Sequence, residues 1–544
     1  MKKRILAFLL GCMLAFPMSA ASAMAAEGET VSSIVPENEE ITDENVMSAA
    51  GQEEEIFVSG EEEAYIEDSL LQDGENLGTG EDEMLIEDES QKLADSQEET
   101  AAIGVSYAAN MYKTGWQSAV EDGAISGASG KRLESFKISL TGAEEKDLAL
   151  SYKAYVYTKG WQEPVSDGEI AGTVGQNLGL EAISISLTGA DADSYDIYYR
   201  VSTKGFGWLD WAKNGAYAGS KDYVYRIEQM QIKIVEKDGE APGETTCPYF
   251  EIPTWNTRTY QYSYGWNKWT TNSTASGHTG TNKRIEAMEL KVSGAADLGI
   301  SYQVYQQSGG WTTSVADGET AGIPDCASNK RISAIRISLT GEAADYFDVY
   351  YRVYLPGFGW LHWTSNGASS GSTGLGYNIQ GVQVRIRAIG KGAPGKTITT
   401  FFDGSSYSSV QKKAMAVLKS TGGTLKGAYN WGTGIKYYKN TPKPASGKDH
   451  LTYYANYAYT YKRGNCYGKA ASFCMMARLL GYTCNFREGY VVSKTGGLAE
   501  HGWTEIYING EKYVVDVSGK DWMIHYGDKG TWVYTDLNGK KIKN

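Results

Sequence analysis

Three residues near the C-terminal end of the chain have the types and the order that nucleophilic catalysis requires. Cys466 lies within Gly-Asn-Cys-Tyr-Gly, His501 precedes Gly-Trp, and Asp516 ends the run Val-Val-Asp, at intervals of 35 and then 15 residues. A thiolate nucleophile needs a base that takes its proton and a third group that orients the base. The pattern therefore predicts Cys466 as nucleophile, His501 as general base and Asp516 as the group that orients the base.

The sequence around the thiol predicts a helix that begins there. Residues 466–480 carry apolar side chains at helical spacing, and Gly481 follows as a stop signal. Unpaired N–H groups and the dipole at a helix N-terminus favour a thiolate, so the start of this helix suits Cys466. Further helices are expected upstream at 408–419 and 453–461.

A strand pair is expected to hold the other two groups. The sequence predicts strands at 482–492, 501–508 and 513–517, a Gly-containing loop at 493–500, and a hairpin turn at Asn509-Gly510. A two-residue turn sets Trp503 opposite Asp516 and places His501 diagonal to that carboxylate, about 7 Å away or less. The helix must then pack against this hairpin for Cys466 to meet His501.

Each of these residues also has a purely structural interpretation. Cys466 could be a core residue or a disulfide partner of Cys484. Pairing with Cys474 is excluded because eight helical residues span ~12 Å, whereas the Cα atoms of a disulfide lie within about 7 Å. His501 could be a residue at a strand end, and Asp516 a turn cap. Cys474 and Cys484 are interpreted as core residues.

These segments resemble the transglutaminase-like superfamily of cysteine enzymes. The resemblance covers about residues 400–530 and rests on Gly-x-Cys at 464–466, His-x-Trp at 501–503 and the hydrophobic-Asp strand at 514–516. It implies an α+β, papain-like domain with the same three roles for the Cys, His and Asp. Transglutaminases tend to carry Gln before the nucleophile and Trp after it. Asn465 and Tyr467 stand there in this chain, which disfavours cross-linking more than it disfavours thiol chemistry.

The middle of the chain, from about residue 104 to 390, contains six copies of one unit. Each copy has a Trp, followed six residues later by Asp or Asn and 11 residues later by Gly; the Trp residues are Trp116, Trp161, Trp208, Trp266, Trp311 and Trp360. Asp-Gly and Asn-Gly pairs suit tight turns, and alternating apolar residues predict half-buried strands. The copies form two sets of three, which predicts two all-β domains of pseudo-threefold symmetry, like a β-prism or a β-trefoil.

The units resemble the clostridial hydrophobic repeats with a characteristic Trp, known as ChW repeats. This resemblance implies an exported surface or wall-associated protein of a Gram-positive anaerobe, with carbohydrate, wall or protein as ligand. We interpret the Trp that recurs in every unit as a core anchor rather than a sugar platform. The additional residues Trp211, Trp269 and Trp363 are the expected ligand-binding side chains.

The first 102 residues differ in composition from the rest. Residues 1–26 combine a basic start, a short apolar run and a small-residue cleavage site, as secretory signal peptides do, and Cys12 also fits a lipoprotein processing box. Residues 27–102 are expected to be a disordered linker, because closely spaced Asp and Glu residues repel one another. This segment accounts for the net charge of −15, so the remainder of the chain is mildly basic.

Cysteine and histidine usage disfavours a disulfide framework and a metal site. Five cysteines remain after the signal peptide, and neither CxxC nor His-rich spacing occurs. No Gly-rich phosphate loop is present, and no later stretch has the ~20 apolar residues of a membrane span. We therefore expect no cofactor, no metal, no nucleic-acid partner and no membrane span. His525 is an alternative base, but no carboxylate strand accompanies it so clearly.

The expected protein is multidomain, exported and cell-wall associated or extracellular. Its expected parts are a signal peptide (1–26), an acidic linker (27–102), repeats 1–3 (103–237), a linker (238–256), repeats 4–6 (257–390) and a catalytic domain (397–544). The expected activity is thioester acyl transfer on protein or wall-peptide amides, with hydrolysis favoured over cross-linking. The alternative is a non-catalytic adhesin or wall-binding protein whose terminal domain is a degenerate enzyme fold.

Overall fold

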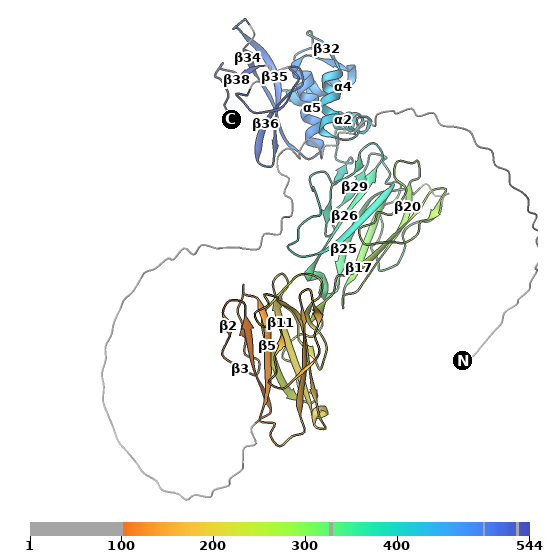
Figure 1. The fold of residues 1–544 in the computed structure, drawn as a ribbon. Helices are drawn as coiled ribbons and strands as arrows, with labels where there is room; N and C mark the ends of the chain where they lie inside the picture. Colours follow the sequence, from red (N-terminus) through yellow and green to blue (C-terminus); the bar gives the residue numbers. More distant parts are fainter. Residues whose placement is uncertain (1–101, 326–329, 493–494, 529–531, 544) are drawn as a thin grey trace, which may run out of the picture. The chain divides into compact units, whose positions relative to one another are not determined.

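A computed structural model describes residues 102–325, 330–492, 495–528 and 532–543 (Figure 1). The expected signal peptide, Cys326 and nearly all of the expected acidic linker lie outside the described residues. Across the part of the chain that is described, no helix has the length and apolar character needed to cross a bilayer.

Each repeat unit is built on one pair of long antiparallel strands. In the first unit β1 (Gly104–Met111) pairs with β5 (Leu133–Thr141), while β2 (Gly115–Trp116) and β3 (Val120–Glu121) pair with β1. Corresponding long pairs are β6 (Ala149–Val156) with β10 (Leu180–Thr188), β11 (Tyr195–Thr203) with β15 (Ile227–Glu236), β17 (Thr254–Gln261) with β20 (Ile285–Ser293), β21 (Gly299–Gln306) with β25 (Ile332–Thr340), and β26 (Phe347–Leu355) with β30 (Gly381–Ala388).

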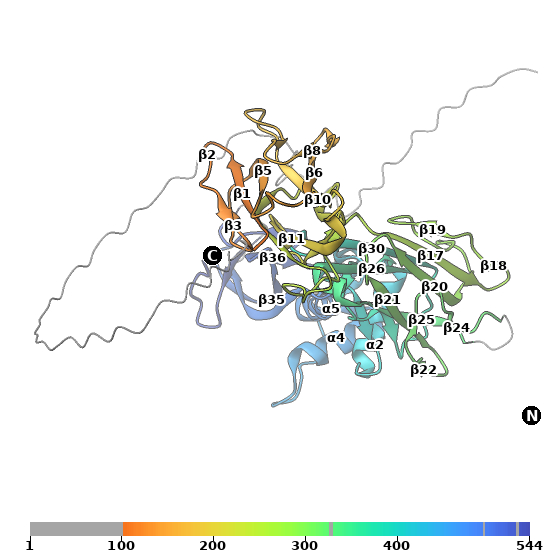
Figure 2. The same ribbon diagram turned by 90° about the horizontal axis from the view of Figure 1, so that it is seen from below.

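Short strands pass from each unit to a neighbour and close each set of three. In the first set β4 (Ser126–Gly127) pairs with β15, β9 (Ala171–Gly172) with β5, and β14 (Ala218–Ser220) with β10. The second set repeats this with β24 (Ala321–Gly322) on β20, β29 (Ser370–Thr373) on β25, and a bridge from Ser276 to Val382. Figure 2 shows β1, β5, β6, β10 and β11 gathered around one another. The cyclic exchange agrees with a pseudo-threefold arrangement, whereas the prism or trefoil type stays a prediction.

The Gly that follows each repeat Trp by 11 residues lies where these exchanged strands meet. Gly127 has a φ of +104°, and a Cβ on it would lie 2.4 Å from the carbonyl oxygen of Glu228 in the third unit. The equivalent Gly277 of the second set would meet the carbonyl oxygen of Gln380 at the same distance. Only Gly permits both this conformation and this approach, which explains why every unit carries one.

Two segments that the sequence did not assign to the repeat sheets belong to them. β16 (Tyr249–Phe250) lies inside the expected linker 238–256 and runs parallel to β14, and β17 already begins at Thr254. β31 (Phe401–Asp403), in the expected catalytic domain, runs parallel to β29. Periodicity did not reveal β16 and β31 because these strands are only two and three residues long.

The C-terminal region is an α+β domain with helices on one side of a five-stranded sheet (Figure 1). Its helices are α2 (Ser409–Ser420), α3 (Leu425–Gly434), α4 (His450–Tyr461) and α5 (Cys466–Leu479). Its sheet has the order β37 (Asp521–Ile524), β36 (Glu511–Asp516), β35 (Leu498–Ile508), β34 (Thr483–Val492), β38 (Val533–Thr535), and a short parallel pair, β32 (Lys436–Tyr437) and β33 (Arg463–Gly464), precedes α5.

Helix α5 is the centre of this domain. Every residue from Cys466 to Ala477 is buried, including Lys469 and Ser472. A helix that is buried on all sides must have neighbours on all sides, and α5 packs against the other helices and the sheet. The nucleophile candidate therefore sits on the most enclosed element of the domain.

Candidate active site

The first turn of α5 fixes the position of Cys466. Asn465 is the N-cap, and its side-chain oxygen accepts a hydrogen bond from the N–H of Gly468 at 3.1 Å. The N–H of Asn465 in turn donates to Thr441 Oγ1 at 2.9 Å. Cys466 is the first residue of the helix, as the sequence predicted, and its own N–H is one of the donors that have no acceptor within the helix.

The hairpin of β35 and β36 has the predicted turn and register. Asn509 and Gly510 have φ values of 52° and 84°, as a type I′ turn requires. Thr504 pairs with Val515, and continuing this register brings Trp503 opposite Asp516. β35 begins at Leu498, three residues earlier than expected, so His501 lies within the strand rather than at its start.

Two contacts bring the helix against the hairpin. The Thr504 hydroxyl donates to the carbonyl of Ala470 in α5 at 3.2 Å. At Gly502 a Cβ would lie 3.0 Å from the Cα of Tyr467 and 2.7 Å from its ring, so the strand approaches the first helical turn as closely as a backbone can. The Gly between His501 and Trp503 is thus a packing requirement that spacing alone did not reveal.

The three predicted residues meet at this junction. His501 Nε2 lies 2.6 Å from Asp516 Oδ2, and the imidazole also interacts with Cys466, which helps to raise its pKa. Because His501 Nε2 hydrogen-bonds the Asp516 carboxylate, Nδ1 is the imidazole nitrogen that is available to the Cys466 thiol. Cys466 and His501 are each 7 % exposed and Asp516 is 0 % exposed, so water reaches the thiol and imidazole only narrowly.

The Asp516 carboxylate is fully occupied by donors. Oδ1 accepts the N–H groups of Ser518 and Gly519, each at 2.9 Å. Oδ2 accepts His501 and lies 3.2 Å from the Tyr534 hydroxyl, which is also 3.0 Å from Asp521 Oδ2. Four donors therefore hold this buried carboxylate in one orientation.

The electrostatics of the site favour a charged imidazole. Burial lowers the pKa of His501, but the hydrogen bonds with Asp516 and Cys466 outweigh burial and raise this pKa to about 9. At neutral pH the imidazole is therefore protonated and lies between the Asp516 carboxylate and Cys466. An oriented imidazolium next to a thiol is the arrangement that cysteine nucleophiles use.

Sequence reasoning missed several residues around the triad. Tyr534 was missed because β38, its strand, is only three residues long. Lys469 is buried one helical turn after Cys466, and its Nζ donates to the carbonyl of Thr433 at 3.1 Å. Burial and the charge of Lys520 lower the Lys469 pKa, and Asp516 opposes them. A Lys within the buried face of a helix was the one signal that could have pointed to it.

The alternative partners lie elsewhere. His525 Nδ1 lies 3.2 Å from the carbonyl of Lys512, and the His525 ring packs on Tyr513, away from the triad contacts. Cys484 Sγ lies 3.2 Å from Cys474 Sγ and not against Cys466. Of these candidates, His501 is therefore the partner of Cys466.

The repeat Trp residues are not core anchors, which corrects our interpretation. Trp116 is 39 % exposed, and the other five are half-buried. Each lies beneath a cation from a neighbouring strand, for example Arg258 at 4.6 Å from Trp266 and Arg336 at 4.0 Å from Trp311. Cation–π packing on the outside of the sheet, rather than burial in the core, explains their recurrence.

Two of the three expected ligand-binding Trp residues have no accessible face. Trp211 and Trp363 are each 4 % exposed, and each packs on an Arg, 4.8 Å from Arg200 and 4.7 Å from Arg352. Trp269 is half-buried between Arg258 and Lys291. Stacking on a sugar needs an open ring face, so the expectation of ligand binding is corrected for Trp211 and Trp363. For Trp269 it stays a prediction.

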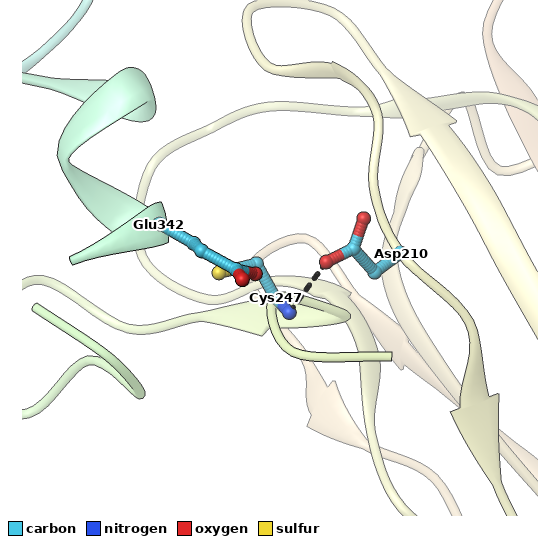
Figure 3. A group of neighbouring side chains, drawn as sticks. All are labelled: Asp210, Cys247 and Glu342. Carbon is cyan, nitrogen blue, oxygen red and sulfur yellow. Dashed lines mark hydrogen bonds between the residues drawn. The ribbon is translucent and has the colours of Figure 1, made fainter. Parts of the chain in front are cut away.

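A second cluster of a thiol and carboxylates lies among the repeats. Asp210, Cys247 and Glu342 bring their ligand atoms within 4.8 Å of one another, and Asp210 accepts the N–H of Cys247 at 2.7 Å (Figure 3). Burial and the neighbouring carboxylates raise the pKa of Cys247 to about 11, so its thiol stays protonated and is a poor metal ligand. In the second repeat set His362 Nδ1 accepts the N–H of Thr399 at 2.9 Å in the same way. Asp210 therefore serves as a backbone clamp.

Family models match both regions of the chain. The Clostridial hydrophobic W (ChW) model matches residues 113–142, 155–189, 204–236, 263–294 and 354–388. The Transglutaminase-like superfamily model matches residues 411–536, which contain all three triad positions. Residues 411–536 form a transglutaminase-like domain. No curated protein matches the chain.

The matches agree with both resemblances and refine the repeat count. Five ChW repeats are matched, while the fifth unit in chain order, around Trp311, is not. That unit nevertheless has the long strand pair, β21 with β25, and its Asp317 accepts the N–H of Val292 as Asp167 of the second unit accepts the N–H of Leu140. The transglutaminase-like domain places the chain's C-terminal region among proteins that are typically cysteine enzymes, and the ChW repeats suggest a surface-binding role.

Proposed function

We propose that this protein is a secreted, surface-associated cysteine enzyme that cleaves protein or wall-peptide amides through a thioester on Cys466. The observation that carries the proposal is His501, which contacts Asp516 through Nε2 at 2.6 Å and whose pKa is raised by both Asp516 and Cys466. An oriented, protonated imidazole beside a thiol at a helix N-terminus is the arrangement that thiolate attack requires.

The chemistry follows from the positions of these groups. The Cys466 thiolate attacks the amide carbonyl, and the N–H of Cys466, which has no acceptor within its helix, is available to the oxyanion. His501 then gives its proton to the leaving amine, and a thioester remains. Water attacks the thioester while His501 takes a proton from it, which regenerates the thiolate–imidazolium pair. Asp516 keeps the imidazole in place throughout.

Water is the acceptor that we propose, in preference to an amine. Asn465 and Tyr467 stand where transglutaminases tend to carry Gln and Trp. Asn465 is occupied as the helix cap, and Tyr467 stacks on Tyr454 with ring centroids 5.3 Å apart. Both residues serve the packing of the helix start and leave the thiol chemistry unchanged.

We further propose that the ChW repeats hold the enzyme at a wall, glycan or protein surface. Trp269 is only half-buried, whereas Trp211 and Trp363 are buried. Loss of wall retention in a Trp269→Ala protein, with the buried Trp residues intact, supports this role. Retention equal to that of the wild type removes Trp269 from it.

The experiment that tests the enzyme proposal compares three full-length proteins with a vinyl-sulfone probe and an amide substrate. Wild type and Cys247→Ala, the matched control, should be labelled and should release ammonia or a new amino terminus. Cys466→Ala should do neither. Product formation that requires an added primary amine would replace hydrolysis by cross-linking. Equal labelling and turnover by Cys466→Ala would overturn the assignment and favour a non-catalytic binding protein.

A further inference from the structure

Besides Cys466, the transglutaminase-like domain contains a pair of neighbouring thiols that the proposed reaction does not use. Cys474 lies in α5, eight residues after the nucleophile candidate, and Cys484 is the second residue of β34. Their sulfur atoms lie 3.2 Å apart, and both residues are buried, with 0 % and 3 % exposure. Among the described cysteines this is the one contact between two thiols.

The surroundings hold the two sulfur atoms against each other. Only a short turn joins the end of α5 to β34, and the Arg478 guanidinium spans it by donating to the carbonyl of Cys484 at 2.7 Å. The sulfurs need to approach by little more than 1 Å to reach the roughly 2.05 Å of a disulfide. We propose that Cys474 and Cys484 form a disulfide that ties the catalytic helix to the sheet.

The bond forms by two exchange steps with an external disulfide, such as oxidised glutathione or the disulfide of a thiol oxidoreductase. The thiolate of one cysteine attacks that disulfide, releases one thiol and leaves a mixed disulfide. The second cysteine, as its thiolate, attacks the protein sulfur of the mixed disulfide and releases the other thiol. The two cysteines lose two electrons and two protons in total, and the external disulfide is reduced to two thiols.

Folding decides when this exchange can occur. Both sulfur atoms are buried in the folded protein, which keeps an external disulfide away from them, and burial together with the Cys474 thiol raises the pKa of Cys484 well above its usual range. The exchange therefore takes place before α5 and β34 close over the two sulfurs. An oxidising environment outside the cell suits this order of events.

The location of the bond gives it a consequence for the site. α5 begins at Cys466, and β34 pairs with β35 so that Gly489 lies opposite His501. A covalent link between α5 and β34 thus joins the element of the thiol to the sheet of the imidazole. Closing this short loop also lowers the entropy of the unfolded chain. Neither effect depends on the reaction proposed above.

Differential alkylation of the full-length protein tests the bond. Protein refolded with a glutathione redox buffer is denatured and alkylated with one reagent, then reduced and alkylated with a second, and its peptides are analysed by mass spectrometry. Cys474 and Cys484 should carry the second label, whereas Cys247 and Cys466 should carry the first. In a Cys247→Ala protein, Cys466, Cys474 and Cys484 should keep the same labels.

Two variants separate the bond from a fold defect. In Cys474→Ser, Cys484 should change from the second label to the first, and the reverse should hold in Cys484→Ser. Reduction of the wild type should lower the Tm of this domain by roughly 5–10 °C and should not change the Tm of the double variant. The first label on both residues in the refolded wild type, or a second label shared with Cys466, would overturn the proposal whatever the activity of the protein.

Discussion

The two clusters that combine a thiol with carboxylates differ in one residue type. In the transglutaminase-like domain His501 stands between Cys466 and Asp516, and this pairing raises the pKa of His501 to about 9. In the repeats Cys247 faces Asp210 and Glu342 with no imidazole between them, and burial and those carboxylates raise its pKa to about 11. Carboxylates alone suppress a thiolate, whereas a carboxylate that acts through a histidine supports one.

The difference shows that a carboxylate activates a thiol only indirectly, through a histidine that lies between the two groups. Asp210 Oδ2 accepts a hydrogen bond from the backbone N–H of Cys247, so this carboxylate has a structural role. Asp516 Oδ1 accepts hydrogen bonds from two backbone N–H groups, and its Oδ2 accepts those of His501 and Tyr534. Changes to the triad should therefore alter reactivity, and the matching changes in the repeat cluster should not.

Replacing the imidazole should have the largest effect on this contrast. In His501→Ala the thiol loses its base and its counter-charge, so kcat/KM for amide cleavage should fall about 10³-fold or more. The matched change His362→Ala, at the clamp of the second repeat set, should leave kcat/KM within about twofold. A His501→Ala protein that keeps most of its activity would remove His501 from the proposed mechanism.

The second largest effect is expected from a change in the spacing between α5 and the hairpin of β35 and β36. In Gly502→Ala the new Cβ would meet the backbone and ring of Tyr467, which forces β35 away from the first turn of α5. We expect kcat/KM to fall about 10²-fold, because a shift of ~1 Å in a catalytic group has that effect. Gly434→Ala, at the end of α3 in the same domain, has nothing within 4 Å and no positive φ, and serves as the comparison. Kinetics with the amide substrate measure both, and equal activity of the two variants would contradict a role for this contact.

The pH dependence should report the proton on His501. Its pKa is about 9 in the folded protein against 6.5 in the reference state, so the folded state binds this proton more tightly. The resulting stability is complete below about pH 6.5 and is lost as the pH rises through 9. Activity should decline over the same upper range, as the imidazolium loses its proton.

Unfolding in urea and initial rates between pH 6 and 10 measure these two effects. His501→Ala should lack this component of the stability profile. A basic limb near pH 7 in the wild type would contradict a histidine held protonated by Asp516.

Loss of the Tyr534 hydroxyl should have the smallest effect. In Tyr534→Phe the Asp516 carboxylate keeps three of its four donors, and a hydrogen bond to a charged group contributes about 1.5–3 kcal/mol. If part of that free energy is expressed in the transition state, kcat/KM should fall roughly 3- to 10-fold. Tyr526→Phe offers a control, because its hydroxyl bonds Trp503 and Glu505 rather than the triad. Equal losses in both variants would indicate general packing damage.

The local sequence predicted much of the site because its signals are short-range. The helix at Cys466, the turn at Asn509-Gly510 and the register that aligns His501 with Asp516 all depend on neighbours in the chain. α3 was missed because Gly427, Gly432 and Gly434 lower its helix propensity, and packing such as that of Gly432 on Val517 replaces it.

The errors arose where distant segments meet. Trp211 and Trp363 were expected to bind ligands, but Gly243 and Gly395 of the segments after each repeat set pack over them. The exchange of short strands between repeat units and the contact between Cys474 and Cys484 also join segments whose proximity no local pattern encodes. Spacing identified which residues carry the chemistry, and tertiary contacts decided which of them are accessible.

The most direct test of the central claim is the rate at which each thiol of the folded protein is alkylated. Iodoacetamide at pH 7, with modification followed peptide by peptide by mass spectrometry, compares Cys466 with Cys247 in one sample. We predict that Cys466 reacts at least about 100-fold faster than Cys247 in the wild type, and that this advantage is lost in His501→Ala. Equal rates for the two thiols, or a Cys466 rate that His501→Ala leaves unchanged, would contradict the assignment of Cys466 and His501 as an activated pair.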